Sequence, residues 1–407
     1  MTELTPDSPH AAPAREGRPR RRVPGARVCA AAVATVLATV TAAAATLGPV
    51  GPAAAAVGTS YAWGQGGYGQ LGNGSTTVYN SSPVAVTPLS HVTQVAGGAY
   101  HSLALRSDGT VWAWGDNGKG ELGNGTTTAS PSPVQVNALS GIVKIAAGYH
   151  DSLALRADGT VWAWGENTYG ELGDGTTTNR TTPVKVPGLT GVTQIATGGY
   201  HSLAVRSDGS VVAWGRNGYG ELGDGTTSDR TTPVQVTGLT GVTQIASGYY
   251  HSIALRSDGT IAAWGYNGDG ELGDGTTANR TTPVEVTGVT GATQIAAGAR
   301  HGLAVRSNST MVAWGYNANG QLGDGTTANR TTPVQVTGLN GVTRIAGGGY
   351  HSLALRSDGS MVAWGYNYYG QLGDGTFTNR TTPWALPGLN WVAQISAGDY
   401  HSVVTTQ

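Results

Sequence analysis

Hydrophobic and polar residues alternate in short runs along most of the chain, and glycine-rich turns separate the runs. The stretch HSLALRSDGTVWAWG, at 101–115, holds two such runs around Asp-Gly, which is the strongest short-range signal of a β-hairpin. The runs TPVQV at 232–236 and VTQIASG at 242–248 predict two further strands. No segment has a helical period of useful length, so the pattern predicts units of four strands without helices.

This four-strand pattern recurs with a fixed period. The tryptophans of the AWG motif are 51 residues apart once and 50 apart five times, at Trp63, Trp114, Trp164, Trp214, Trp264, Trp314 and Trp364. Four short strands per unit are typical of one β-propeller blade, and residues 57–407 hold seven units. We therefore predict an all-β fold, a seven-bladed β-propeller of four-stranded blades. Because the chain enters and leaves the repeats in mid-blade, we expect pairing of N-terminal and C-terminal strands to close the ring.

The first 56 residues differ in composition from the repeats. Six arginines lie between Arg15 and Arg27, followed by an Ala/Val/Leu/Thr stretch at 29–47 and a run of alanines that ends at Ala56. This order predicts a signal peptide at 1–56, cleaved after Ala56, with an uncleaved membrane anchor as the alternative. We expect residues 57–407 to be secreted or on the cell surface, without stable membrane insertion after cleavage. The only cysteine, Cys29, lies in the leader, so no disulfide is expected.

Charge narrows the classes of partner. Without the leader, 17 basic and 21 acidic residues remain, a net charge of −4. Binding to nucleic acid needs a basic face. We therefore expect no nucleic-acid partner.

The recurring stretch HSLALRSDGTVWAWGDNGKGELGNGT, at 101–126, resembles the regulator-of-chromosome-condensation repeat family, whose members form seven-bladed propellers. The resemblance covers residues 57–407 and, with the leader, points to a secreted bacterial member. Founding members of the family exchange guanine nucleotide on a small GTPase and bind chromatin. The constant spacing here leaves no room for the wedge that those members insert, so no small GTPase is expected. A secreted bacterial relative inhibits β-lactamases purely as a protein-binding surface.

Comparison of the seven copies separates nearly constant positions from variable ones. The Trp-Gly, Leu-Gly and Thr-Pro-Val positions hardly change, which indicates a structural role. Recurring aspartates could suggest calcium, but lone turn aspartates are commoner; they are Asp174, Asp224, Asp274, Asp324 and Asp374. Recurring Asn-Arg-Thr-Thr segments read as glycosylation sequons or, more simply, as turns; they begin at Asn179, Asn279, Asn329 and Asn379. We expect neither a metal nor a cofactor.

Histidines share one position in six copies: His101, His201, His251, His301, His351 and His401. A hydrolytic site needs unlike groups around one reacting atom. We therefore expect each histidine to be hydrogen-bonded within its own blade, and no catalytic residue. A hydrolase-type enzyme remains the alternative, with its site where the repeat is broken: His150, Asp151, Arg300, His301, Gly302, Lys119, Arg216, Asp269, Trp384 or Trp391.

Tyrosines concentrate in the variable positions. All of the 17 except Tyr61 and Tyr79 lie in the loop after the tryptophan or just before the histidine position, and strand direction brings both positions to one end of the ring. Tyrosines on glycine-rich loops suit a binding surface, although they could instead cover the channel rim. The predicted binding residues are Tyr100, Tyr149, Tyr169, Tyr200, Tyr219, Tyr249, Tyr250, Tyr266, Arg300, Tyr316, Tyr350, Tyr366, Tyr368, Tyr369 and Tyr400. We expect a protein partner, for example a secreted enzyme that is inhibited, with a cell-envelope glycan as the alternative.

Overall fold

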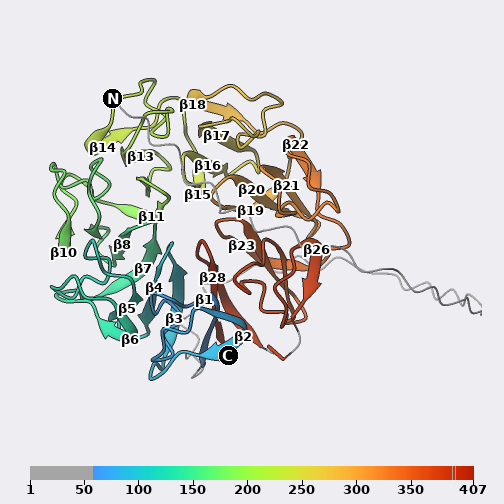
Figure 1. The fold of residues 1–407 in the computed structure, drawn as a ribbon. Helices are drawn as coiled ribbons and strands as arrows, with labels where there is room; N and C mark the ends of the chain where they lie inside the picture. The colour runs from blue at the N-terminus through green and yellow to red at the C-terminus, as the bar shows by residue number, and fades with distance from the viewer. Residues whose placement is uncertain (1–57, 387, 390) are drawn as a thin grey trace, which may run out of the picture. The chain divides into compact units, whose positions relative to one another are not determined.

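The fold is described from a computed structural model of the chain, which describes residues 58–407 except 387 and 390. The predicted leader and its cleavage site lie outside these residues. The described residues form 28 strands in seven four-stranded antiparallel sheets, and no helix. Among them no helix is long and apolar enough to span a membrane. Figure 1 shows the blades following one another around a ring, which confirms the predicted seven-bladed propeller.

Each blade contributes one strand to each of four concentric positions. The innermost strands contact one another around the ring; they are β3 (Val92–Gly97), β7 (Ile142–Ala147), β11 (Val192–Thr197), β15 (Val242–Ser247), β19 (Ala292–Ala297), β23 (Val342–Gly347) and β27 (Val392–Ala397). The second strands are β4 (His101–Arg106), β8 (Asp151–Arg156), β12 (His201–Arg206), β16 (His251–Arg256), β20 (His301–Arg306), β24 (His351–Arg356) and β28 (His401–Thr406). The third are β1 (Ser60–Gln65), β5 (Val111–Gly115), β9 (Val161–Gly165), β13 (Val211–Gly215), β17 (Ile261–Gly265), β21 (Met311–Gly315) and β25 (Met361–Gly365). The outermost are β2 (Tyr79–Ala85), β6 (Ser130–Gln135), β10 (Arg180–Lys185), β14 (Arg230–Gln235), β18 (Arg280–Glu285), β22 (Arg330–Gln335) and β26 (Arg380–Ala385).

The core lies between blades as well as within them. The second strands are buried at five consecutive positions, because each blade packs against a neighbour on both of its faces. The AWG tryptophans are fully buried, and each indole donates a hydrogen bond to a main-chain oxygen of the preceding blade, as Trp164 does to Glu121 over 2.7 Å. The tryptophans therefore join neighbouring blades.

The two ends of the described chain share one blade, in the strand order β2-β1-β28-β27. Strand β1 pairs with β28 from Ser60 opposite Thr405 to Gly64 opposite His401, and Figure 1 shows the two strands side by side. The predicted closure of the ring by N-terminal and C-terminal strands is confirmed.

Candidate functional site on the tyrosine face

Strand register brings the two variable positions of each repeat to the same end of the ring. His101, at the start of β4, lies opposite Gly115, at the end of β5, and the amide of Asp116 donates to the carbonyl of Tyr100 over 2.9 Å. Gly115 has a φ of 106° and a Cβ there would stand 2.5 Å from that carbonyl, so only glycine allows this approach. We call this end of the ring, with the turn before each second strand and the loop after each third strand, the tyrosine face.

Tyrosine rings on this face contact one another from blade to blade around the channel. Ring centroids are 5.6 Å apart for Tyr200 and Tyr250 and 6.2 Å apart for Tyr350 and Tyr400. Between Tyr250 and Tyr350 the equivalent position is Arg300, whose guanidinium lies 5.0 Å from the Tyr316 ring. The structure therefore gathers the predicted residues into one connected aromatic layer.

Most of this layer is only partly open to solvent. Tyr368 is 50% exposed, whereas the other predicted residues are half-buried: Tyr100, Tyr149, Tyr169, Tyr200, Tyr219, Tyr249, Tyr250, Tyr266, Arg300, Tyr316, Tyr350, Tyr366, Tyr369 and Tyr400. Burial raises the pKa of Tyr100 and of Tyr350 to about 12. The rings thus cover the rim of the channel as well as facing outward.

Two exposed tyrosines were not among the predicted binding residues. Tyr68 is 46% exposed and its ring lies 4.9 Å from Tyr100. Tyr79, 42% exposed, begins β2 and lies 5.3 Å from Tyr369. Tyr79 lies outside both variable positions and reaches the layer because ring closure brings β2 beside the preceding blade. We call Tyr79, Tyr366, Tyr368 and Tyr369 the tyrosine seam.

The two arginines of the face are engaged within the chain. The guanidinium of Arg216 lies 4.7 Å from the Tyr250 ring centroid and within 6 Å of three further rings, Tyr169, Tyr200 and Tyr219. Arg300 forms ion pairs with Asp269 and, over 3.5 Å, with Glu271. Both cations therefore hold the aromatic layer together.

The innermost strands enclose a cavity of about 320 Å³ lined mostly by glycine and alanine. On the tyrosine face Tyr249 reaches across the channel and donates its hydroxyl proton to the Asp399 carboxylate of the closing blade. Burial raises the pKa of Asp399 to about 6. This hydrogen bond joins the blade of Tyr249 to the closing blade at the cavity lining.

The histidines form a hydrogen-bonded ring between blades. The Nε2 of His301, for example, lies 2.9 Å from the hydroxyl of Ser352 in the next blade. That hydroxyl donates to the carbonyl of Gln321 over 2.9 Å, so Nε2 must carry the proton and donate to the serine. Equivalent pairs are His101 with Ser152, His201 with Ser252, His351 with Ser402 and His401 with Ser102. The expectation of bonds within each blade was wrong, because the serine that meets each ring belongs to the following blade.

These histidines are buried and neutral. Burial lowers the pKa of His101, His201, His251, His301 and His351 to about 3, and of His401 to about 4. A general base needs a pKa near the working pH and access to substrate. Their environment suits a structural role.

The series of histidine–serine hydrogen bonds between blades is interrupted at two positions. His251 faces Gly302 where the other copies have serine, and its Nε2 has no hydrogen-bond partner among the described residues. Asp151 replaces the histidine of its blade and accepts a hydrogen bond from Thr197 over 2.6 Å; burial raises the pKa of Asp151 well above its ordinary value.

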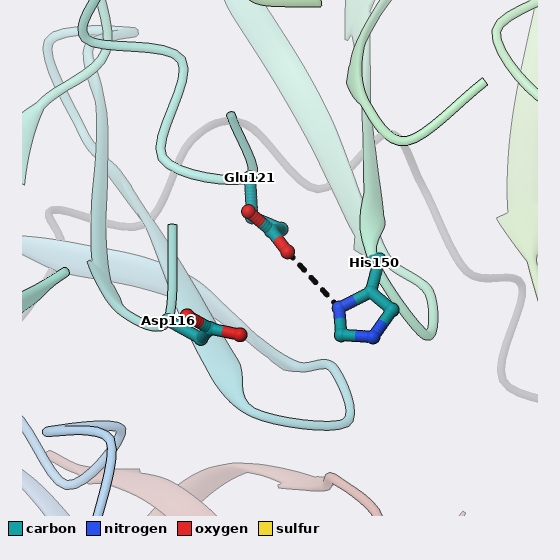
Figure 2. Close-up of side chains that lie close together, drawn as sticks. All are labelled: Asp116, Glu121 and His150. Atoms are coloured by element: carbon teal, nitrogen blue, oxygen red, sulfur yellow. Dashed lines mark hydrogen bonds and ion pairs between the residues drawn. The ribbon is translucent and has the colours of Figure 1, made fainter. Parts of the chain in front are cut away.

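A third departure lies beside Asp151. His150 Nδ1 is 3.0 Å from Glu121 Oε1, and Figure 2 shows the Asp116 carboxylate facing the same imidazole. Ligand atoms of the three side chains all lie within 4.8 Å of one another. Burial lowers the pKa of His150, but the hydrogen bond and charge of Glu121 outweigh it and raise this pKa above its ordinary value. The sequence marked His150 as unusual, but Glu121 and Asp116 were not recognised as its neighbours.

The recurring aspartates and asparagines of the turns form hydrogen bonds with groups in the same loop. Asp174 accepts hydrogen bonds from Thr176 over 2.7 Å and from Arg180 over 2.6 Å, and the other four aspartates repeat this arrangement. Asn179 accepts the amide of Asn167 over 3.0 Å, as Asn279, Asn329 and Asn379 do in their blades. These groups stabilise the loop after each third strand.

A closed ring of seven such blades defines the chain as a seven-bladed β-propeller protein. The sequence profile of the RCC1-like domain matches residues 31–293 and 190–349, and two profiles of the Regulator of chromosome condensation (RCC1) repeat match residues 358–405 and 342–371. The chain therefore belongs to the RCC1-like repeat family.

Each curated relative matches only a short part of the chain. The human E3 ubiquitin-protein ligase HERC2 is 45% identical over 71 residues, which are 17% of this chain and 1% of HERC2. The human probable E3 ubiquitin-protein ligase HERC6 is 43% identical over 70 residues, 17% of this chain and 7% of HERC6. The match thus spans a small part of these relatives.

Solved structures match most of the chain. Human WBSCR16 has a TM-score of 0.78 at 24% identity, covering 86% of this chain and 99% of that one. Prp20p from Saccharomyces cerevisiae has a TM-score of 0.77 at 25% identity, covering 86% and 91%. These relatives come from human and yeast, so the secreted and bacterial nature that the resemblance implied remains a prediction.

The comparisons correct the predicted partners. Prp20p is described by its binding to Gsp1p, a small GTPase, and to histones. The exclusion of a small GTPase and of nucleic acid was therefore wrong. Net charge describes the whole chain and does not exclude a local basic surface, and even repeat spacing does not exclude contacts made by loops of ordinary length.

Proposed function

We propose that this protein is exported and binds a protein partner through its tyrosine face, with the tyrosine seam as the centre of the contact. The leader-like sequence at 1–56 supports export. Membership of a family of interaction modules supports a protein partner.

The tyrosine seam is the observation that supports this binding site most directly. Tyr368 is 50% and Tyr79 42% exposed, yet Tyr369 packs against both, with ring centroids 5.2 Å and 5.3 Å away. Rings held in place before binding lose little conformational entropy on contact, and tyrosine is enriched at the energetic centres of interfaces. The seam therefore offers large, preorganised contacts.

We propose a protein partner without restricting it to one kind of protein. A small GTPase or a histone is included, because the structural neighbour Prp20p is described as binding both kinds of protein. If the partner is an exported enzyme, the seam would cover part of its surface and inhibit it. Inhibition of that enzyme's activity by this protein is then a second measurement.

The test is affinity capture with the full chain, followed by titration of each purified captured protein. The triple variant Tyr366→Ala, Tyr368→Ala, Tyr369→Ala should weaken binding at least 30-fold, since removal of a single hot-spot residue costs about 2 kcal/mol or more. The matched control is Trp384→Ala, which removes an exposed aromatic ring (48% exposed) from the outermost strand β26 and should leave binding unchanged. Unaltered affinity of the triple variant, with its melting temperature preserved, would refute the proposed face.

A further inference from the structure

The contact between the blades β3–β6 and β7–β10 differs chemically from the other six. The position before the second strand is tyrosine in five copies, Arg300 in one and His150 in this one. The second position after the tryptophan, which faces it, is Asp116 here. We propose that His150, Glu121 and Asp116 bind a divalent transition-metal ion of the zinc class, a site that goes beyond the proposed binding function.

The geometry of the three side chains suits such an ion. Zinc binds imidazole nitrogen and carboxylate oxygen at about 2.0–2.2 Å, which places tetrahedral ligand atoms about 3.4 Å apart. Glu121 Oε1 and His150 Nδ1 are 3.0 Å apart, and all three ligand atoms lie within 4.8 Å of one another. Small side-chain rotations are therefore enough to place an ion between them.

The ligands are held in place by neighbouring groups. Glu121 is fully buried, and its Oε2 accepts the amide of Lys119 over 2.8 Å, which leaves Oε1 directed at the imidazole. Asp116 Oδ1 accepts the amide of Asn117 over 2.8 Å. The imidazole packs edge-on against Tyr149, with ring centroids 4.6 Å apart. Supporting contacts of this kind orient metal ligands in proteins.

Charge and exposure favour a cation at this position. Two carboxylates face one imidazole, and the nearby Lys119 ammonium pairs instead with Glu166, over 3.3 Å. One nitrogen and two carboxylate ligands suit zinc better than calcium, which takes six to eight oxygens. The His150 side chain is 18% exposed, so water can reach the ion and occupy its open coordination position.

The other copies provide internal comparisons. At the next contact Glu171 takes the place of Glu121, but Tyr200 takes that of His150. Glu221 and Glu271 instead lie near arginines, Arg216 at 3.9 Å and Arg300 at 3.5 Å. Four copies thus supply a buried glutamate at this position, and among the described residues only the copy with His150 completes a set of three metal ligands.

The experiment measures Zn²⁺ binding by the full chain carrying Cys29→Ser, stripped of metal with a chelator and titrated by calorimetry. We expect one Zn²⁺ per chain, and a visible d–d absorption band when Co²⁺ replaces it. His150→Tyr, which installs the residue of five other copies, should weaken Zn²⁺ binding at least 30-fold while retaining the melting temperature of the metal-free protein. Asp116→Asn, of nearly identical shape, should weaken it as well.

The control is His91→Ala, because His91 is exposed and lies away from the cluster, before β3. It should leave the affinity for Zn²⁺ unchanged. The proposal is overturned if no Zn²⁺ binds, if His150→Tyr and Asp116→Asn bind it as well as the parent, or if His91→Ala abolishes binding. None of these measurements uses a protein partner, so their failure is distinct from failure of the proposed function.

Discussion

Removal of one hydroxyl from the ring of histidines and serines tests how the blades are joined. Ser352 is fully buried, accepts a hydrogen bond from His301 over 2.9 Å and donates one to the Gln321 carbonyl over 2.9 Å. Ser352→Ala leaves the buried Nε2–H of His301 without a hydrogen bond, whereas the Gln321 carbonyl still accepts one from the Trp364 indole over 2.9 Å. Since one buried group left without its partner costs about 1–3 kcal/mol, the free energy of unfolding should fall by about 1–3 kcal/mol.

This loss converts into a measurable change in melting temperature. An unfolding entropy of about 2.1 cal/mol/K per residue gives about 0.7 kcal/mol/K for the propeller, so Tm should fall by about 1.5–4 °C in calorimetry. The matched control is Ser357→Ala, an exposed serine in the turn after β24, which should change stability by less than about 0.5 kcal/mol. A Tm for Ser352→Ala within about 1 °C of that of the parent would refute the role given to the hydroxyl.

Three further predictions concern closure, strain and pH. Deletion of His401–Gln407 removes β28 from between β1 and β27 and should lower the calorimetric Tm of the whole propeller by more than about 10 °C; an unchanged melting curve would contradict closure by this strand. Trp391 is 70% exposed and has a φ of 59°, where five copies have glycine, so Trp391→Gly should raise the free energy of unfolding in urea by about 1 kcal/mol, and a decrease would argue against strain there. The pKa of His301 is about 3, below the ordinary 6.5, so the unfolded chain binds its proton first and stability is lost as pH falls below 6.5. Between pH 6.5 and 4.5, the parent should lose about 2 kcal/mol relative to His301→Gln, and parallel pH profiles would contradict the neutral buried state.

The fold could be predicted because the repeat that forms each blade recurs at a fixed spacing in the sequence. Hairpins around Asp-Gly and the tryptophan spacing determine strands, blade number and closure without knowledge of any contact. The partners of the histidines could not be predicted in this way. Ser352 lies 51 residues after His301, and the sequence pattern does not show whether a side chain turns toward its own blade or the next.

The candidate sites were only partly predictable for a related reason. The variable positions indicated where tyrosines gather, but Tyr79 joins them through ring closure, which depends on how β2 lies beside the preceding blade. Glu121 lies at a position that is glutamate in four copies and glutamine in three, and the sequence comparison did not single it out. Its pairing with His150 depends on packing between two neighbouring blades.

The closing blade also sets the order in which the protein can be completed. Of the described strands, β1 is made first and its partner β28 last, with Ser60 opposite Thr405. At synthesis rates of about 5–20 residues per second, the edge of β1 waits about 20–70 s for its partner. During that interval an unpaired strand edge is available for pairing with other chains. A chaperone, or passage of the chain through a membrane before folding, would therefore shield β1 until its partner strand is complete.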